Sequence, residues 1–393
     1  MRKLHAAATA IVLGTAAIGA GALLQPALAA VSSAVGRPLL EAKSLLAAKN
    51  YRAAMDRVNA ASAAAKTAEE HNIVDQMKNA IAIASGDTST VGGAKAKIAA
   101  DSNAGRWRDV IADADALRKF NAMDGTYNLL VAQAYYQLHD AKGCIGYIKR
   151  NGLGGETALM LLQRCAYDAQ DDVTQRSALE QLVASTGKAE HWKNLLNLSE
   201  RARGLKDHQT LDIFRIKSMT GTIAPEDIVL YATFAIQFKS PAEAKAVVEK
   251  AIADKTIPAS DRTNRLLKLA NDRLNQYNAT FGKTLADAQK QPKGDDLVAI
   301  GEYQIGAGKA KEAIDTVQAG IAKGLNDPAE GQVRLGAAYL AAGQKADAIK
   351  AFNAVKGDEK VVMVARLYSI YARSGGAAAA APAPAKAAKG RRK

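Results

Sequence analysis

The sequence has few of the residues from which metal centres and nucleophilic catalysts are built. It contains two cysteines and five histidines in 393 residues. The cysteines do not form a CxxC pair, and no histidine stands in the HxxxH or ExxH spacing of metal-binding helices. We therefore expect no metal, no cofactor and no catalytic residue, and we predict that the protein is not an enzyme.

Strand-like alternation of apolar and polar residues is also scarce. Helical periodicity runs almost without interruption from Arg37 to Arg373. After the first 29 residues, no stretch has the length and hydrophobicity of a transmembrane helix. We therefore expect an all-α chain whose ordered part covers residues 30–374.

Residues 1–29 have the three parts of a secretory signal peptide. Arg2 and Lys3 form its basic start, residues 6–24 are apolar, and Ala27-Leu28-Ala29 fits cleavage before Ala30. A retained membrane anchor is the less favoured alternative, because the apolar run is weakly hydrophobic and ends at Gln25 and Pro26. We predict a periplasmic protein whose signal peptide is removed after Ala29.

The chain is basic, with a formal net charge of +14. Five positive charges lie in its last eight residues, namely Lys386, Lys389, Arg391, Arg392 and Lys393. Segment 375–393 is rich in Ala, Pro and Lys and has little apolar surface to bury, so we predict a disordered tail. A basic balance fits an anionic glycan or lipid of the cell envelope. The export signal argues against nucleic acid as a partner.

One pattern of small and apolar residues is written twice near the C-terminal end. Counting the first unit from Gly294 and the second from Ala329, positions 7 and 8 hold Ile300-Gly301 and Leu335-Gly336. Position 15 holds Gly308 and Gly343, and positions 20 and 24 hold Ala313 and Val317, then Ala348 and Phe352. Small residues at positions 8 and 20 allow two helices to approach closely, and glycine at position 15 suits a helix end.

This pattern resembles the tetratricopeptide repeat (TPR) family, whose 34-residue unit is a pair of antiparallel helices. The clearest repeats are 35–68, 106–155 and 294–362. The resemblance implies a right-handed α-solenoid of stacked antiparallel helix pairs over residues 30–374. Two features depart from the family: the step between the last two units is 35 residues, and Gln304 stands where an aromatic residue is usual.

The resemblance also implies where a partner would bind. In the family, the concave face is lined by positions 2, 5, 9, 12 and 13 of each first helix. The main residues at these positions are Leu129, Gln133, Tyr136, Val298, Glu302, Ile305, Val333, Ala337 and Leu340. Positions 5 and 9 lack the Lys and Asn of a carboxylate clamp, so a groove of this kind suits an apolar segment. The alternative is that these residues pack against adjoining helices.

Cys144 and Cys165 lie on adjacent expected helices, 21 residues apart. In an oxidising periplasm, a disulfide between them would join two neighbouring helix pairs. The alternative is that both are small buried residues at helix contacts.

These observations favour a non-catalytic periplasmic scaffold that binds another envelope protein on its concave face. The alternative is a binder of an anionic envelope polymer or lipid. That binder would use the tail and a basic surface containing Lys188, Lys193, Arg201, Arg203, Lys206, Arg215 and Lys217. Lytic transglycosylases also stack helix pairs, but no segment here has the composition of their lysozyme-like domain.

Overall fold

A computed structural model describes residues 31–374 of the chain. The predicted signal peptide and the predicted tail at 375–393 lie outside the described residues. The described part contains 19 α-helices and no β-strand, so the prediction of an all-α solenoid built from antiparallel helix pairs is confirmed. None of these helices is long and apolar enough to span a bilayer.

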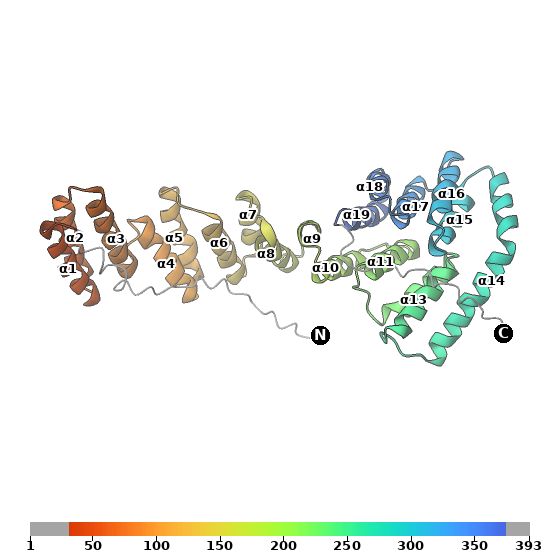
Figure 1. The fold of residues 1–393 in the computed structure, drawn as a ribbon, viewed down its shortest axis with the longest axis horizontal. Coiled ribbons are helices and arrows are strands. Elements are labelled where there is room, and N and C mark those ends of the chain that lie inside the picture. Colours follow the sequence, from red (N-terminus) through yellow and green to blue (C-terminus); the bar gives the residue numbers. More distant parts are fainter. Residues whose placement is uncertain (1–30, 375–393) are drawn as a thin grey trace, which may run out of the picture. The chain divides into compact units, whose positions relative to one another are not determined.

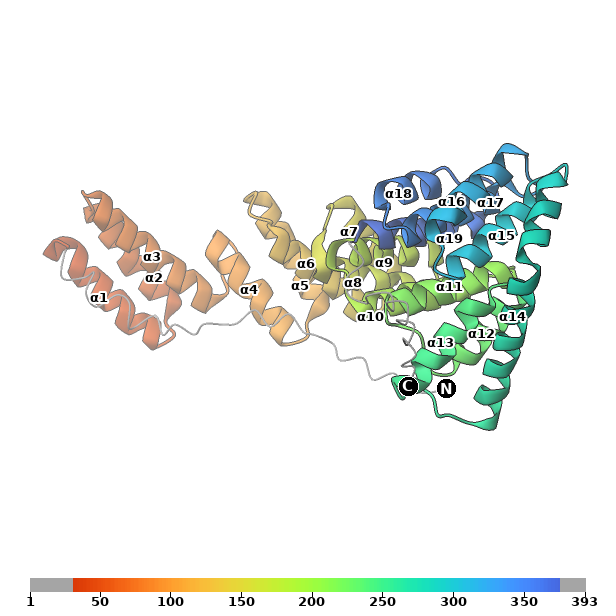
Figure 2. The same ribbon diagram turned by 45° about the vertical axis from the view of Figure 1, so that its right-hand side comes forward.

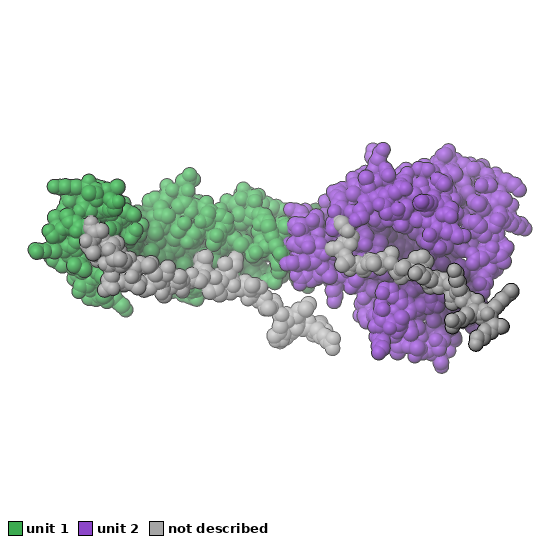
Figure 3. Space-filling model, in the orientation of Figure 1, with its two compact units in different colours: residues 1–175 green, residues 176–393 purple. Residues whose placement is uncertain are grey.

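The chain divides into two compact units, residues 1–175 (unit 1) and 176–393 (unit 2), coloured separately in Figure 3. The helices of unit 1 are α1 (Ser33–Ala47), α2 (Tyr51–Ala64), α3 (Ala68–Ser85), α4 (Val91–Asn103), α5 (Trp107–Lys119), α6 (Gly125–Gln137), α7 (Ala141–Arg150) and α8 (Gly155–Asp168). Helix α9 (Asp172–Thr186) contains the division.

The helices of unit 2 continue in the order drawn in Figure 1. They are α10 (Ala189–Glu200), α11 (Asp207–Met219), α12 (Asp227–Gln237), α13 (Pro241–Ala253), α14 (Asp261–Lys290), α15 (Asp295–Gly306), α16 (Ala310–Ala322), α17 (Pro328–Ala341), α18 (Lys345–Asn353) and α19 (Glu359–Arg373).

Unit 1 is a stack in which each helix packs on the next one. Helix α1 also contacts α3, and α6 contacts α8. Contact between the first helices of successive pairs is the arrangement of TPR-like repeats. Short polar side chains begin these helices: Asp124 accepts hydrogen bonds from the backbone N–H groups of Thr126 and Tyr127, and Asp140 accepts one from Gly143.

Unit 2 folds back on itself. Helices α15, α17 and α19 pack in succession, and α19 then packs against α11, which begins the unit's run of helix pairs. Figures 1 and 2 both show α11 lying beside α19. The face that these first helices share is therefore turned towards α11.

The two predicted repeats lie in this unit with the expected close helix contacts. A Cβ atom at Gly301 would lie 2.2 Å from Cγ2 of Val317, and one at Gly336 would lie 2.5 Å from the ring of Phe352. In both repeats, the side chain that lies closest to the glycine at position 8 is thus the one at position 24 rather than the one at position 20. Gly308 and Gly343 end α15 and α17 with φ angles of +76° and +77°, as the sequence predicts.

Helix α14 differs from its expected form. The many charges and few aromatic residues between Ser260 and Gln291 predict a polar pair of helices, but the segment is one continuous helix of 30 residues. Its start is fixed by a capping box between Ser260 and Thr263. No proline or left-handed residue interrupts it, and Gly282 does not break it. Proline is typical of the first turn of a helix, so the sequence predicts a helix start at Pro38, but Pro38 lies inside α1.

Candidate functional site

Helix α11 is buried on almost every side, and its sequence explains why. Leu211 and Phe214 pack into a core with Ile228 and Ala235 of α12. Charged residues alternate with these apolar ones, and Asp212 is also buried. Because a buried charge is costly without a partner, each of these polar side chains needs an opposite charge nearby.

The partners form what we call the ion network, which consists of His208, Asp212, Arg215, Glu243, Glu302, Glu330 and Arg334. At its centre, the guanidinium group of Arg334 on α17 forms a bidentate pair with the carboxylate of Asp212 on α11. Both side chains are 1% exposed. Arg334 also donates to Glu302 Oε1 at 3.2 Å and to Glu330 Oε1 at 2.9 Å.

Arg215 makes the second set of contacts from α11. Its Nε and Nη2 donate to the two carboxylate oxygens of Glu243 on α13, at 2.7 and 2.8 Å. Its Nη1 donates to Glu302 Oε1 on α15 at 2.7 Å. Arginine suits this position because its planar fork can pair with two carboxylates at once.

Two tyrosine hydroxyl groups complete the network. Tyr231 donates to Glu243 at 2.8 Å, and Tyr368 on α19 donates to Asp212 at 3.0 Å. Polar side chains therefore tie α11 to α13, α15, α17 and α19, which are far from it in the sequence.

His208 lies at the start of α11 between two carboxylates. Its Nε2 is 3.0 Å from both oxygens of Glu302, and its Nδ1 is 2.9 Å from Glu330 Oε1. Its ring stacks on Phe238 with centroids 4.3 Å apart. Burial and Arg334 lower the pKa of His208, but Glu302 and Glu330 outweigh them and raise it to about 9. Both ring nitrogens of His208 are thus protonated near neutral pH and donate to the two glutamates.

The charge on His208 should make unit 2 less stable in alkali. Its pKa in the folded protein, about 9, is above its ordinary value of 6.5. Protonation therefore stabilises the fold fully below pH 6.5, and this stabilisation is lost as the pH rises through 9. We expect the free energy of unfolding of unit 2 to fall by up to about 3 kcal/mol between pH 6.5 and 10.

Urea unfolding can measure this change in unit 2 alone. The two tryptophans, Trp107 and Trp192, lie in different units, so a Trp107→Phe background leaves Trp192 as the reporter. His208→Gln should flatten the pH dependence, whereas His71→Gln on an exposed position of α3 should keep it. An equally steep decline in the His208→Gln protein would show that another group titrates.

The ion network leaves no carboxylate without a cationic partner. Asp212 and Glu302 each accept from both arginines, Glu243 accepts from Arg215, and Glu330 accepts from Arg334 and is 2.9 Å from His208. Burial raises the pKa of Glu330, but Arg334 and His208 outweigh this effect and lower it to about 2. An arrangement of fully paired charges fixes the positions of helices.

The predicted partner-binding residues of unit 2 lie on the side that faces α11. Val298, Glu302 and Val333 are buried, and Glu302 belongs to the ion network. The others, Ile305, Ala337 and Leu340, are partly exposed. A pocket of about 220 Å³ remains at the start of α11, lined by His208, Val298, Glu302 and Glu330 among others.

The corresponding residues of unit 1 are more accessible. On α6, Leu129 and Tyr136 are partly exposed, whereas Gln133 is 8% exposed and its Oε1 atom accepts no hydrogen bond from any residue in the described part. No arginine–carboxylate network lines this helix within residues 31–374. Tyr167 and Val173, on either side of the α8–α9 turn, are 63% and 81% exposed.

The basic surface expected from the sequence is smaller in the structure. Arg215 lies in the ion network, and Lys217 is 4% exposed. The Lys217 ammonium group pairs with Glu200 and Asp227 at 2.8 and 2.9 Å. Two of the expected surface cations are therefore inside unit 2, because their helix is buried on both sides.

Cys144 and Cys165 are joined by a disulfide in the structure, with Cα atoms 6.2 Å apart. The bond links α7 to α8, and both residues are fully buried. The sequence leaves this pairing open beside the alternative of two unpaired buried thiols.

Sequence reasoning missed the ion network, although one signal pointed to it. The run Leu211-Asp212-Ile213-Phe214-Arg215-Ile216 places two charges in a helix that is apolar on opposite sides. Such a helix is buried all round, so its charges require partners from other helices. The prediction that Arg215 and Lys217 belong to a basic surface is therefore wrong.

Comparisons with known proteins add little to this description. No protein-family model matches the chain, and no curated protein matches it. Among solved structures, it is similar to a chain in the crystal structure of the APC/C hetero-tetramer Cut9-Hcn1, at 11% sequence identity. The match covers 86% of this chain and 67% of that one, with a TM-score of 0.21. A score this low carries no argument about function, and the fold rests on the helix packing described above.

Proposed function

We propose that this protein is a non-catalytic scaffold of the periplasm that binds a segment of another envelope protein on α6 and the neighbouring first helices of unit 1. One observation carries this proposal. Leu129 and Tyr136 are accessible on α6, whereas the equivalent face of unit 2 is occupied by that unit's own α11. Partly exposed aliphatic and aromatic side chains on a rigid helix are typical anchors for a partner segment.

The proposed location rests on two features of the chain. Residues 1–29 have the pattern of a signal peptide, and the Cys144–Cys165 disulfide suits an oxidising compartment. Cell fractionation and N-terminal sequencing test this part, because export with cleavage after Ala29 gives a mature chain that begins at Ala30.

The binding surface can be tested by crosslinking in living cells. A photoreactive residue in place of Tyr136 should capture one defined protein partner, which mass spectrometry identifies. Binding of the purified partner should weaken about tenfold or more in Leu129→Asp, because the new carboxylate would be buried in the contact.

Two further variants make the outcome decisive. Ala112→Asp introduces the same charge at an exposed position of α5 and should leave binding unchanged. A chain that ends at Ser374 lacks the basic tail and should also bind normally. If that truncation abolishes binding while Leu129→Asp does not, the tail is the binding element and the scaffold proposal is wrong.

A further inference from the structure

The pocket at the start of α11 is bounded by buried and half-buried groups of unit 2. One of its lining residues is Glu302 of the ion network, which is 4% exposed. The apolar residues of its lining are all buried or partly buried, and they are Phe238, Val298, Ala299, Leu325 and Gly331. The pocket volume of about 220 Å³ is below the roughly 300–1,000 Å³ of sites that enclose a whole small molecule. The pocket is therefore sized for one side chain.

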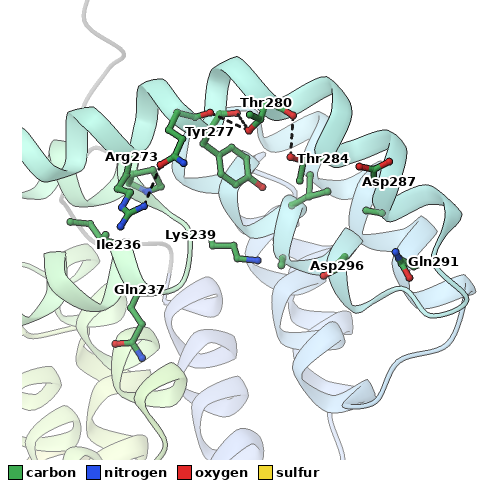
Figure 4. Close-up of a pocket in the computed structure, with 15 residues that line it drawn as sticks. Ile236, Gln237, Lys239, Arg273, Tyr277, Thr280, Thr284, Asp287, Gln291 and Asp296 are labelled. Carbon is green, nitrogen blue, oxygen red and sulfur yellow. Dashed lines mark hydrogen bonds between the residues drawn. The ribbon is translucent and has the colours of Figure 1, made fainter.

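This pocket differs from the larger hollow beside it. The hollow, of about 670 Å³, runs along α14 and shares Gln237 and Lys239 with the pocket (Figure 4). Exposed polar residues of α14 line the hollow, among them Arg273, Gln276 and Asp287, as expected of a solvated helix face. The smaller pocket is formed instead against the ion network.

The ion network is not electrically neutral. With His208 protonated, it contains four carboxylates but three cations, so it carries one net negative charge. Glu330 lines the pocket, and its contacts with Arg334 and His208 both involve Oε1, each at 2.9 Å. Within residues 31–374, no group donates a hydrogen bond to Glu330 Oε2. The network therefore offers an acceptor atom of a charged carboxylate at the pocket.

Carboxylates also predominate among the outer lining residues. Asp295 and Asp327 line the pocket, together with one lysine, Lys239. Asp295 accepts two hydrogen bonds from Asn326, and Asp327 Oδ1 accepts one from the backbone N–H of Glu330. In the described part of the chain, neither aspartate forms an ion pair. Apolar walls beside carboxylates that lack a cation fit a cationic group on an apolar stem.

We propose that this pocket holds an arginine side chain, Arg391 or Arg392, from the protein's own C-terminal segment 386–393. That segment carries five positive charges and no negative one, so it complements the net charge of the pocket. It also belongs to the same unit and follows α19. The 17 residues from 375 to 391 span up to about 56 Å when extended, which exceeds the roughly 45 Å length of α14, a helix of 30 residues.

Arginine fits the pocket better than lysine. Asp327 and Glu330 lie within one turn at the start of α17, and the planar guanidinium fork can donate to two carboxylates at once. The arginine stem can pack on Val298 and Leu325. Attachment to the same chain raises the local concentration of the arginine to about the millimolar range, so that even a weak contact is well populated. This docking lies in unit 2 and does not depend on the partner proposed for unit 1.

Fluorescence anisotropy with a labelled peptide of residues 385–393 tests the proposal. The peptide should bind the chain that ends at Ser374. It should bind the full mature chain about tenfold more weakly, because the attached tail competes for the pocket. A peptide with Arg391→Lys and Arg392→Lys keeps its charge but loses the guanidinium fork, and it should bind about tenfold more weakly than the natural peptide.

Two variants of the chain that ends at Ser374 test the pocket itself. Asp327→Asn removes one pocket charge but keeps the cap of α17, because asparagine also caps helices. It should weaken peptide binding about fivefold. Asp315→Asn is the matched control, because it removes a charge from an exposed position of α16 outside the pocket. It should bind the peptide like the unsubstituted chain.

A photoreactive residue in place of Gln237, which lines the pocket and is exposed, locates the tail in the full chain. It should crosslink to residues 386–393 of the same molecule, as mass spectrometry of the monomer shows. Crosslinks to the tail of a second copy, or capture of another protein in cells without the tail, would overturn the proposal. So would equal binding of the arginine and lysine peptides, or an equal loss of binding in Asp315→Asn and Asp327→Asn.

Discussion

Replacing Arg334 with methionine should lower the free energy of unfolding of unit 2 by about 3–5 kcal/mol. The side chain is 1% exposed and pairs with Asp212, Glu302 and Glu330 from three helices. Burial lowers the pKa of Arg334, but these carboxylates outweigh it and raise the pKa above its ordinary value. Methionine would fill much of the volume but leave buried carboxylates without their cation. Urea unfolding followed by Trp192 fluorescence in the Trp107→Phe background measures the loss.

A surface pair provides the matched control for this experiment. Lys268 pairs with Asp272 at 3.0 Å, and the two side chains are 78% and 60% exposed, so Lys268→Met should cost less than about 1 kcal/mol. Asp212→Asn combined with Arg334→Met should be more stable than Arg334→Met alone, because the double variant no longer buries the Asp212 carboxylate without its arginine partner. Equal losses for Arg334→Met and Lys268→Met would mean that the ion network does not hold α11 in place.

Those features of the fold that depend on neighbouring residues could be predicted from the sequence. Gly301 and Gly336 lie 16 residues before Val317 and Phe352, and these distances follow from the period of one helix pair. The left-handed ends at Gly308 and Gly343 likewise follow from the local chain. Helix α14 could not be placed in the same way, because its mixed apolar and polar faces suit both one long helix and a helix pair.

The candidate site could not be predicted, because its contacts join distant residues. Asp212 and Arg334 are 122 residues apart, and Asp212 and Tyr368 are 156 apart. A periodic pattern places Glu302 and Val333 on the first helices of their repeats, but it does not say what lies opposite them. The packing of α19 against α11 closes unit 2 and thereby decides what lies opposite these residues. The sequence around either helix carries no signal for this packing.

This closure changes how the TPR-like face of unit 2 should be understood. In an open solenoid, the first helices leave a groove for a partner helix. Here α11 lies against that face and supplies Asp212 and Arg215 as its contacts. A partner on the same face would have to displace a helix held by paired buried charges, which costs several kcal/mol. The proposed partner is therefore expected on α6 of unit 1 rather than on this face.

Removal of the disulfide should lower the stability of unit 1 by about 3 kcal/mol. Cys144 and Cys165 are 21 residues apart, and closing a loop of this length restricts the unfolded chain by about that amount. Cys144→Ala with Cys165→Ala should therefore unfold at a lower urea concentration than the oxidised protein. Trp107 fluorescence in a Trp192→Phe background follows unit 1 alone.

Reduction of the wild-type protein provides an independent measurement, since it opens the bond without changing a side chain. Oxidised and reduced forms that unfold at the same urea concentration would contradict the predicted contribution. Thiol labelling in cells extends the argument to location: the full chain should have no reactive cysteine, whereas a chain lacking residues 2–29 should stay in the reducing cytoplasm and label at both positions once unfolded. Equal labelling of the two chains would contradict export, even if the bond stabilises the purified protein as expected.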